Sequence, residues 1–207
     1  MAQCRAAEEH NNQIVLRLAG LLDFMAQSME YPDQDWLTSD HWQLLLSILD
    51  ELGWSEERNA LTAADDILSE PGLTALQVEY TRLFINAVPH VIAPPYGSIY
   101  TDSEGILFGP SAEKTKMFYR QQGFDLRGPN DIPDHLNHEL RFLSLLLQDA
   151  KFCETEQFLA EFFRPWFCVF CRRVIDESRH PYYRVMMKLI HFFTKEDEEH
   201  VNQVDPA

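Results

Sequence analysis

The sequence predicts an all-α protein: a single-domain helical bundle of about eight or nine helices with one long ordered loop. Apolar residues recur at steps of three and four through most of the 207 residues, which is the spacing of one helix face. No run of Val, Ile and Thr at period two predicts a strand, and no internal repeat is present. An apolar content of 45% and an aromatic content of 12% are sufficient for one packed core.

Four helices are expected before residue 89. They run from residue 14 to about 29, from a Ser39 or Asp40 N-cap to near Gly53, from Ser55 to before Pro71, and from near Thr74 to Pro89. Residues 89–110 then lose the helical period and are rich in proline and glycine, with aromatic anchors at Tyr96, Tyr100 and Phe108. A loop of this length inside a compact domain is typical of a functional segment.

Four more helical blocks are expected after the loop. The first is capped by Ser111 and ends at Gly123, and the second has Asp131 as N-cap and Pro133 in its first turn. The third runs from about residue 156 to 177 and is kinked or restarted at Pro165. The last begins near His180 and Pro181. The bundle is thus expected to occupy residues 1–195, with N-terminal helices to about 124, a linker at 125–130 and C-terminal helices at 131–195. Residues 196–207 are expected to form a frayed, charged tail.

The charge balance restricts the partners that the protein can bind. Against 17 Lys and Arg there are 33 Asp and Glu, a net charge of −16, which repels nucleic acid and anionic lipid. The acidic surface serves either solubility or the steering of a basic peptide. Residues 1–13 lack the cationic start of a secretory signal, and no apolar run approaches the roughly 20 residues of a membrane span, so a cytoplasmic location is expected.

The best enzymatic pattern lies where the helix after the linker begins. On a helix, His135, His138 and Glu139 could present two nitrogens and a carboxylate to a metal, and a metal-dependent hydrolase is therefore an alternative function. Their order is not that of the zinc peptidases, and the residues also suit an ordinary helix start. Cys168 and Cys171 have metal spacing but lie in an aromatic helical run, where core packing is the simpler interpretation. We expect no catalytic residue, no metal and no cofactor.

An aromatic surface is the other candidate site. Tyr80, Leu83 and Phe84 share one helix face, and the segment PPYGSIY at residues 94–100 adds rigid prolines and amphipathic tyrosines. Asp134 adds a carboxylate that could pair with arginine. Spacing alone leaves two interpretations open, a peptide-binding surface and an ordinary core.

Several motifs in a fixed order resemble those of the TorD/DmsD family of redox-enzyme maturation chaperones. They are EYTRLF at residues 79–84, PPYGSIY at 94–100, PDHL at 133–136 followed by EL at 139–140, FRPW at 163–166 and HPYYR at 180–184. The segment DSEGILFG at residues 102–109 is most similar to the DmsD branch. The resemblance covers about residues 73–193.

The resemblance implies an all-α chaperone, not an enzyme, that binds the twin-arginine signal peptide of a molybdopterin-dependent oxidoreductase such as dimethyl sulfoxide or trimethylamine N-oxide reductase. It implies assistance with cofactor insertion, assembly and export proofreading, and a monomer or a domain-swapped homodimer. The twin-arginine translocase and cofactor-biosynthesis proteins are further partners that it suggests. The implied peptide-binding residues are Tyr80, Leu83, Phe84, Pro95, Tyr96, Tyr100, Asp134 and His135. Tyr80 and Tyr96 stand where some relatives have tryptophan.

Overall fold

The computed structural model describes residues 2–64, 66–88, 91–103, 105–126, 128 and 131–196, with side chains described from residue 11 onward. This part of the chain is built from helices and contains no strand, which confirms the all-α prediction. Its α-helices are α1 (Ala2–Ser28), α2 (Ser39–Glu51), α3 (Ser55–Ala63), α4 (Glu70–Tyr80), α5 (Ser98–Thr101), α6 (Pro110–Gln121), α7 (Leu136–Gln148), α8 (Phe152–Phe158), α9 (Arg164–Glu177) and α10 (Pro181–Thr194). Two π-helical turns, Thr81–Ile85 and Leu159–Phe163, extend α4 and join α8 to α9.

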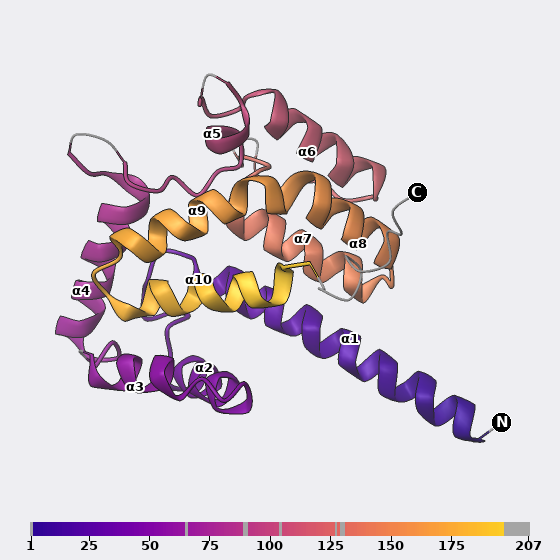
Figure 1. The fold of residues 1–207 in the computed structure, drawn as a ribbon, viewed down its shortest axis with the longest axis horizontal. Coiled ribbons are helices and arrows are strands. Elements are labelled where there is room, and N and C mark those ends of the chain that lie inside the picture. The colour runs from indigo at the N-terminus through magenta and orange to yellow at the C-terminus, as the bar shows by residue number, and fades with distance from the viewer. Residues whose placement is uncertain are drawn as a thin grey trace, which may run out of the picture.

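The helices are arranged around the antiparallel pair α9 and α10, which crosses the centre of the molecule (Figure 1). α2 and α3 lie at one end with α4 beside them, and α5 and α6 lie above α9. α1 packs along α7, where the Ser144 hydroxyl donates a hydrogen bond to the carbonyl oxygen of Ala19 at 2.8 Å. Both residues are small and buried, so the two helix backbones can approach closely.

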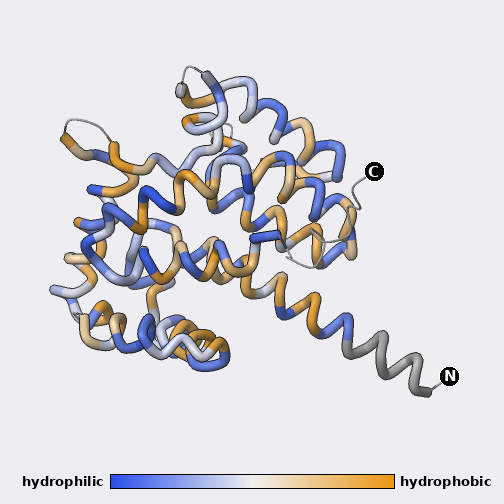
Figure 2. Tube along the Cα trace, viewed as in Figure 1, coloured by the Kyte–Doolittle hydropathy of each residue, from blue (hydrophilic) through white to orange (hydrophobic). Residues whose placement is uncertain are grey.

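One hydrophobic core runs through the bundle. Hydrophobic and hydrophilic residues alternate along the helices in Figure 2, which is the amphipathic pattern that the spacing predicts. The largest fully buried side chains come mainly from α8, α9, α10 and the π-helical turn before α9: Phe158, Phe163, Trp166, Phe167, Phe170, Tyr182 and Tyr183. Because the core draws on helices from both halves of the chain, the N-terminal and C-terminal halves are packed together in it.

The start of α4 differs from the prediction. Pro71 does not separate two helices; it lies in the first turn of α4, and the Ser69 side chain caps that turn by accepting a hydrogen bond from the Gly72 N–H at 3.2 Å. Proline is tolerated in a first helical turn because the N–H it lacks would have no helical partner there.

The start of α7 also differs. Asp131 was predicted as its N-cap, but the helix begins at Leu136 with His135 as N-cap. The residues before it form a turn, in which His135 N–H donates to the Ile132 carbonyl at 3.2 Å, and they pair with the loop: Leu136 N–H donates to the Pro95 carbonyl at 3.0 Å, and Gly97 N–H donates to the Asp134 carbonyl at 2.9 Å. This tertiary pairing overrides the local capping signal. The loop on the other side of the pairing contains the four-residue helix α5, although it was expected to contain no helix.

The restart at Pro165 is present as predicted, with Pro165 in the first turn of α9 after a π-helical turn. Positions 127, 129 and 130 of the predicted linker, and residues 197–207 of the predicted tail, lie outside the described residues. None of the helices described combines the length and the hydrophobicity needed to cross a lipid bilayer.

Candidate functional site

A groove of about 430 Å³ opens where four separate segments meet. Tyr31 follows α1, Tyr80 ends α4, Tyr96 lies in the loop before α5, and His135 precedes α7; all four line the groove. We call it the tyrosine groove. It brings together three of the residues predicted for a peptide site, Tyr80, Tyr96 and His135, from positions up to 55 residues apart in the chain.

The aromatic rings of the groove form two edge-on pairs. Tyr31 meets Tyr80 with ring centroids 5.4 Å apart, and Tyr96 meets His135 at 4.9 Å. Tyr31 is 45% exposed, whereas Tyr80 is largely buried and its hydroxyl lies 3.4 Å from the Met29 carbonyl oxygen. The groove therefore offers flat apolar ring surface at its rim and a fixed aromatic floor, the combination that suits an amphipathic peptide.

Two predicted residues lie beneath this surface and do not reach it. Leu83 and Phe84 are both buried, and Phe84 packs edge-on against Tyr80 at 4.9 Å and against Tyr183 at 5.4 Å. Their part in the site is to support Tyr80 from behind.

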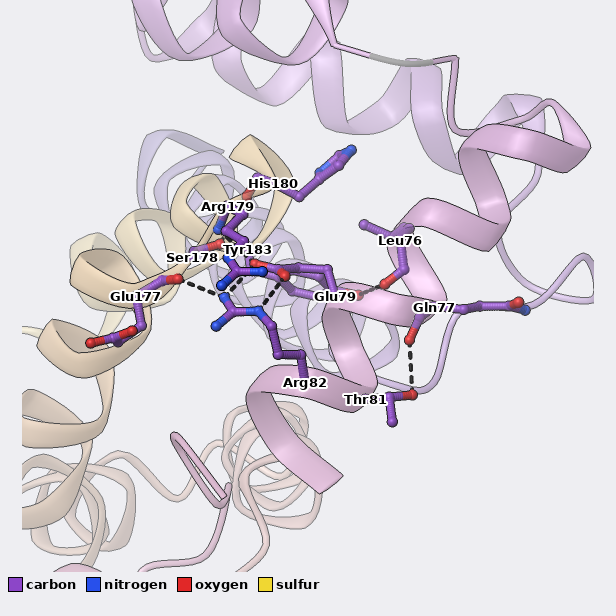
Figure 3. A network of polar contacts seen from close by, with 10 residues as sticks. All are labelled: Leu76, Gln77, Glu79, Thr81, Arg82, Glu177, Ser178, Arg179, His180 and Tyr183. Atoms are coloured by element: carbon purple, nitrogen blue, oxygen red, sulfur yellow. Dashed lines mark hydrogen bonds and ion pairs between the residues drawn. The ribbon is translucent and has the colours of Figure 1, made fainter. Parts of the chain in front are cut away.

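A polar network fixes the end of α4 to the turn between α9 and α10 (Figure 3). The Arg82 guanidinium donates to both oxygens of Glu79, at 2.8 and 2.9 Å, and to the Glu177 carbonyl oxygen at 2.6 Å. Glu79 also accepts the backbone N–H of Arg179 at 2.6 Å. Burial opposes the ionisation of Glu79, but these hydrogen bonds outweigh it and lower the pKa of the carboxyl. Because Tyr80 follows Glu79 directly, the network holds the stretch of backbone that carries its ring.

The loop beneath Tyr96 is held by the residues before α7 and by α9. The Tyr100 ring stacks on Trp166 with centroids 5.9 Å apart. Gly97 lies against the same indole: a Cβ at this position would be only 3.1 Å from Trp166, so only glycine fits without a shift. Pro95, which is buried, contributes its carbonyl to the hydrogen bond from Leu136. Pro95 and Tyr100 thus position Tyr96.

Asp134 does not have the role predicted from its charge. It is 1% exposed and accepts a hydrogen bond from the backbone N–H of Ser98, so in this structure it does not lie at the surface, where the predicted pairing with an arginine would take place. Burial raises the pKa of Asp134, the expected effect on a carboxyl removed from water. The residue links the loop to the start of α7.

His135 both caps α7 and lines the groove. Its Nδ1 accepts the Asn137 N–H at 3.1 Å, which requires that this nitrogen carries no proton. Burial lowers the pKa of His135 to about 3, and nearby His138 and Arg141 act in the same direction. Burial lowers the pKa of His138 as well. Both rings are therefore neutral at physiological pH.

Charged residues that the motifs did not identify surround the groove. Glu30, Asp131 and Arg141 line it, and Arg141 forms an ion pair with Glu30. Asp131 and Arg141 also line an adjoining depression of about 530 Å³ whose other residues include Phe124 and Phe142. One signal in the sequence could have indicated Arg141: it follows Asn137 by four residues and His138 by three, so these polar residues share one face of an otherwise apolar helix.

Comparison with known proteins identifies the family. Residues 52–172 match the family model described as the nitrate reductase delta subunit, which covers more than half of the chain. The chain belongs to the TorD/DmsD family of redox-enzyme maturation chaperones. The resemblance found in the motifs is confirmed, and the relatives are chaperones and not enzymes.

Individual members of the TorD/DmsD family align over most of the chain. The Tat proofreading chaperone DmsD of Salmonella paratyphi A is 28% identical over 155 residues, which are 74% of this chain and 71% of that protein. The chaperone protein TorD of Vibrio vulnificus is 26% identical over 138 residues, 61% of this chain and 64% of that protein. The crystal structure of a candidate redox enzyme maturation protein from Archaeoglobus fulgidus superposes with a TM-score of 0.59 at 28% identity, covering 84% of this chain and 92% of the other.

In this TorD/DmsD chaperone, the residues around α7 do not assemble the metal site of the hydrolase alternative. The rings of His135 and His138 approach with centroids 5.7 Å apart at the groove, but Glu139 is buried on another side of the helix, where it accepts a hydrogen bond from Trp166 Nε1 at 2.9 Å. Burial raises the pKa of Glu139 well above its usual value. Among the described residues no three His, Cys, Asp or Glu side chains converge as metal ligands.

Proposed function

We propose that this TorD/DmsD chaperone binds the twin-arginine signal peptide of a molybdopterin-dependent oxidoreductase in the tyrosine groove. The observation that carries the proposal is the meeting of Tyr31, Tyr80, Tyr96 and His135, from four separate segments, around one groove in a protein of this family. The chaperone works in the cytoplasm, assists cofactor insertion and assembly of its client, and withholds the leader from the twin-arginine translocase until the client is complete.

The chemistry of such a leader suits the groove and its surroundings. A twin-arginine leader has a cationic start followed by an apolar stretch. The net charge of −16 favours approach of the cationic part. Apolar segments gain about 25 cal/mol for each Å² removed from water, and the cost of ordering the peptide is subtracted from that gain. The tyrosine rings and the adjoining depression with Phe124 and Phe142 supply this apolar surface.

The eight residues predicted for the site divide into two groups in this proposal. Tyr80, Tyr96 and His135 line the groove and contact the peptide. The other five hold those three in place: Leu83, Phe84, Pro95, Tyr100 and Asp134. Tyr31 joins the contact group because it is exposed at the rim and packs on Tyr80.

Isothermal titration calorimetry with a synthetic twin-arginine leader tests the proposal. Tyr31→Ala and Tyr96→Ala should each weaken binding about tenfold or more, the loss typical of an aromatic anchor in an interface. Phe152→Ala is the matched control, because this ring is 50% exposed and does not line the groove. Unchanged affinity in both tyrosine variants, with the fold intact by circular dichroism, would remove the groove from the function.

A further inference from the structure

We propose that the tyrosine groove contains a dedicated arginine site, formed by Asn137 on its floor and Glu30 and Asp131 at its rim, and that Arg141 holds the Glu30 carboxylate when no ligand is bound. The inference rests on the proposed function and specifies which part of the leader the site recognises. It replaces Asp134, which is buried, as the source of the carboxylate that meets a ligand arginine.

The first observation is an unpaired acceptor on the groove floor. Asn137 is 6% exposed and lines the groove, and its side-chain oxygen Oδ1 has no hydrogen-bond partner among the described residues. Buried polar atoms in folded proteins are nearly always paired, and one left unpaired by the chain at a surface groove is open to a partner from outside the chain. The missing partner is a hydrogen-bond donor, and a guanidinium carries five donors and no acceptor.

The second observation is the pair of carboxylates at the rim. Glu30 and Asp131 both line the groove, Glu30 from the segment after α1 and Asp131 from the segment before α7. The Glu30 side chain is 35% exposed, so a ligand can reach it. The fixed fork of a guanidinium matches the geometry of a carboxylate better than an ammonium does, so these groups favour arginine over lysine.

The third observation is that a guanidinium already lies there. Arg141 Nη2 contacts Glu30 Oε1, and its Nε lies 4.0 Å from Asp23 Oδ1. The Arg141 side chain is 42% exposed, and exposed ion pairs contribute little to stability, so exchange for a ligand arginine costs the fold little. The internal arginine demonstrates that Glu30 is placed to hold a guanidinium, and it competes with the ligand for that place.

This competition predicts effects of opposite sign from the two partners of one ion pair. In calorimetry with a synthetic twin-arginine leader, Glu30→Gln should weaken binding about tenfold, because a charge-assisted hydrogen bond is lost. Arg141→Gln should strengthen binding several-fold, because the internal competitor is removed. A leader with both arginines replaced by lysine should bind the wild-type chain more weakly, and this penalty should shrink in Glu30→Gln. Asp50→Asn, in an exposed pair with Arg58 outside the groove, is the control and should bind like the wild type.

Several results would overturn the arginine site. Wild-type affinity in Glu30→Gln, together with weakened binding in Tyr96→Ala, would refute it and leave the groove intact. Weaker binding in Arg141→Gln would show that Arg141 contacts the ligand and does not compete with it. If the wild-type chain binds no leader at all, the proposed function fails, and the arginine site fails with it.

Discussion

The carboxylate of Asp134 accepts a hydrogen bond from the backbone N–H of Ser98 and so joins the loop before α5 to the start of α7. Gly97 N–H donates to the Asp134 carbonyl, so one residue makes two links between these segments. Tyr96 and His135 lie on either side of the junction with ring centroids 4.9 Å apart. The geometry of the groove therefore depends on a buried carboxylate that does not itself face the ligand.

Substitution of Asp134 distinguishes this role from direct contact with the leader. Asp134→Ala should lower the free energy of unfolding by about 1–3 kcal/mol, because the Ser98 N–H loses its buried acceptor. Asp134→Asn keeps an acceptor oxygen and removes a carboxyl whose pKa is raised by burial, so stability at pH 7 should be retained. Denaturant unfolding followed by circular dichroism measures both.

Leader binding by the same two variants provides the complementary result. Asp134→Asn should bind the leader with wild-type affinity. Asp134→Ala should lose leader affinity by the same factor at about 50 and about 300 mM salt, because the loss arises from a displaced loop and not from a lost charge. If Asp134→Asn loses leader affinity at low salt but not at high salt, Asp134 forms a direct ion pair with an arginine of the leader.

Asn137→Ala should separate binding from stability. The variant removes a buried acceptor that has no partner, so the free energy of unfolding should stay within about 1 kcal/mol of the wild type or rise. Leader affinity should nevertheless fall, because the donor on the ligand loses its acceptor. A purely structural Asn137 would give the reverse: reduced stability with unchanged affinity once the chain is folded.

Removing Glu79 should strongly destabilise the protein. The side chain is 7% exposed and pairs with Arg82, which is 17% exposed, so Glu79→Ala leaves a guanidinium largely buried without its carboxylate. We expect a loss of about 3–5 kcal/mol in the free energy of unfolding. Asp50→Ala, which breaks an exposed pair with Arg58, should cost less than about 1 kcal/mol. Equal losses in chemical denaturation would contradict a special role for the network at the end of α4.

The pH dependence of stability should include a contribution from His41. Burial lowers the pKa of His41 to about 4, while the unfolded chain titrates near 6.5. Between these values the unfolded state binds a proton that the folded state does not, so stability falls as the pH is lowered through this window. The slope is at most about 1.4 kcal/mol per pH unit for one such group.

His41→Phe isolates that contribution. The ring contact with Phe24, with centroids 4.3 Å apart, is one that a phenylalanine can also make, and the Ser28 hydroxyl keeps its bond to the Phe24 carbonyl. Between pH 6.5 and 5 the variant should lose about 1–2 kcal/mol less than the wild type in the free energy of unfolding. Burial raises the pKa of Asp134 and Glu139, which acts in the opposite direction in both proteins and cancels in the comparison. Identical pH profiles in urea titrations would show that His41 is protonated in the folded state.

Much of the fold could be predicted from the sequence, because helical spacing and proline positions are local signals. The restart at Pro165 and the start of α10 at Pro181 follow from one residue each. The start of α7 could not be predicted, because the pairing of Leu136 with Pro95 depends on a contact about 40 residues away in the chain. A local capping rule applied to Asp131 has no access to that contact.

The site was predictable in part for the same reason. Tyr80, Tyr96 and His135 stand in motifs, and the family resemblance indicated that they belong together. The burial of Asp134 could not be predicted, because a motif gives the identity of a residue and not its exposure to solvent. Glu30 lies outside every motif and reaches the groove only because α1 packs along α7, where Arg141 meets it.

Photo-crosslinking from the rim of the groove tests the central claim most directly. Tyr31 is replaced by p-benzoylphenylalanine, the protein is irradiated with a synthetic twin-arginine leader, and the adduct is measured by intact-mass spectrometry. Phe152, which is similarly exposed, carries the same replacement in the control. A leader adduct at position 31 that is absent at position 152, and that excess unlabelled leader suppresses, is the predicted result. Adducts of equal yield at both positions, or only at position 152, would contradict binding in the tyrosine groove.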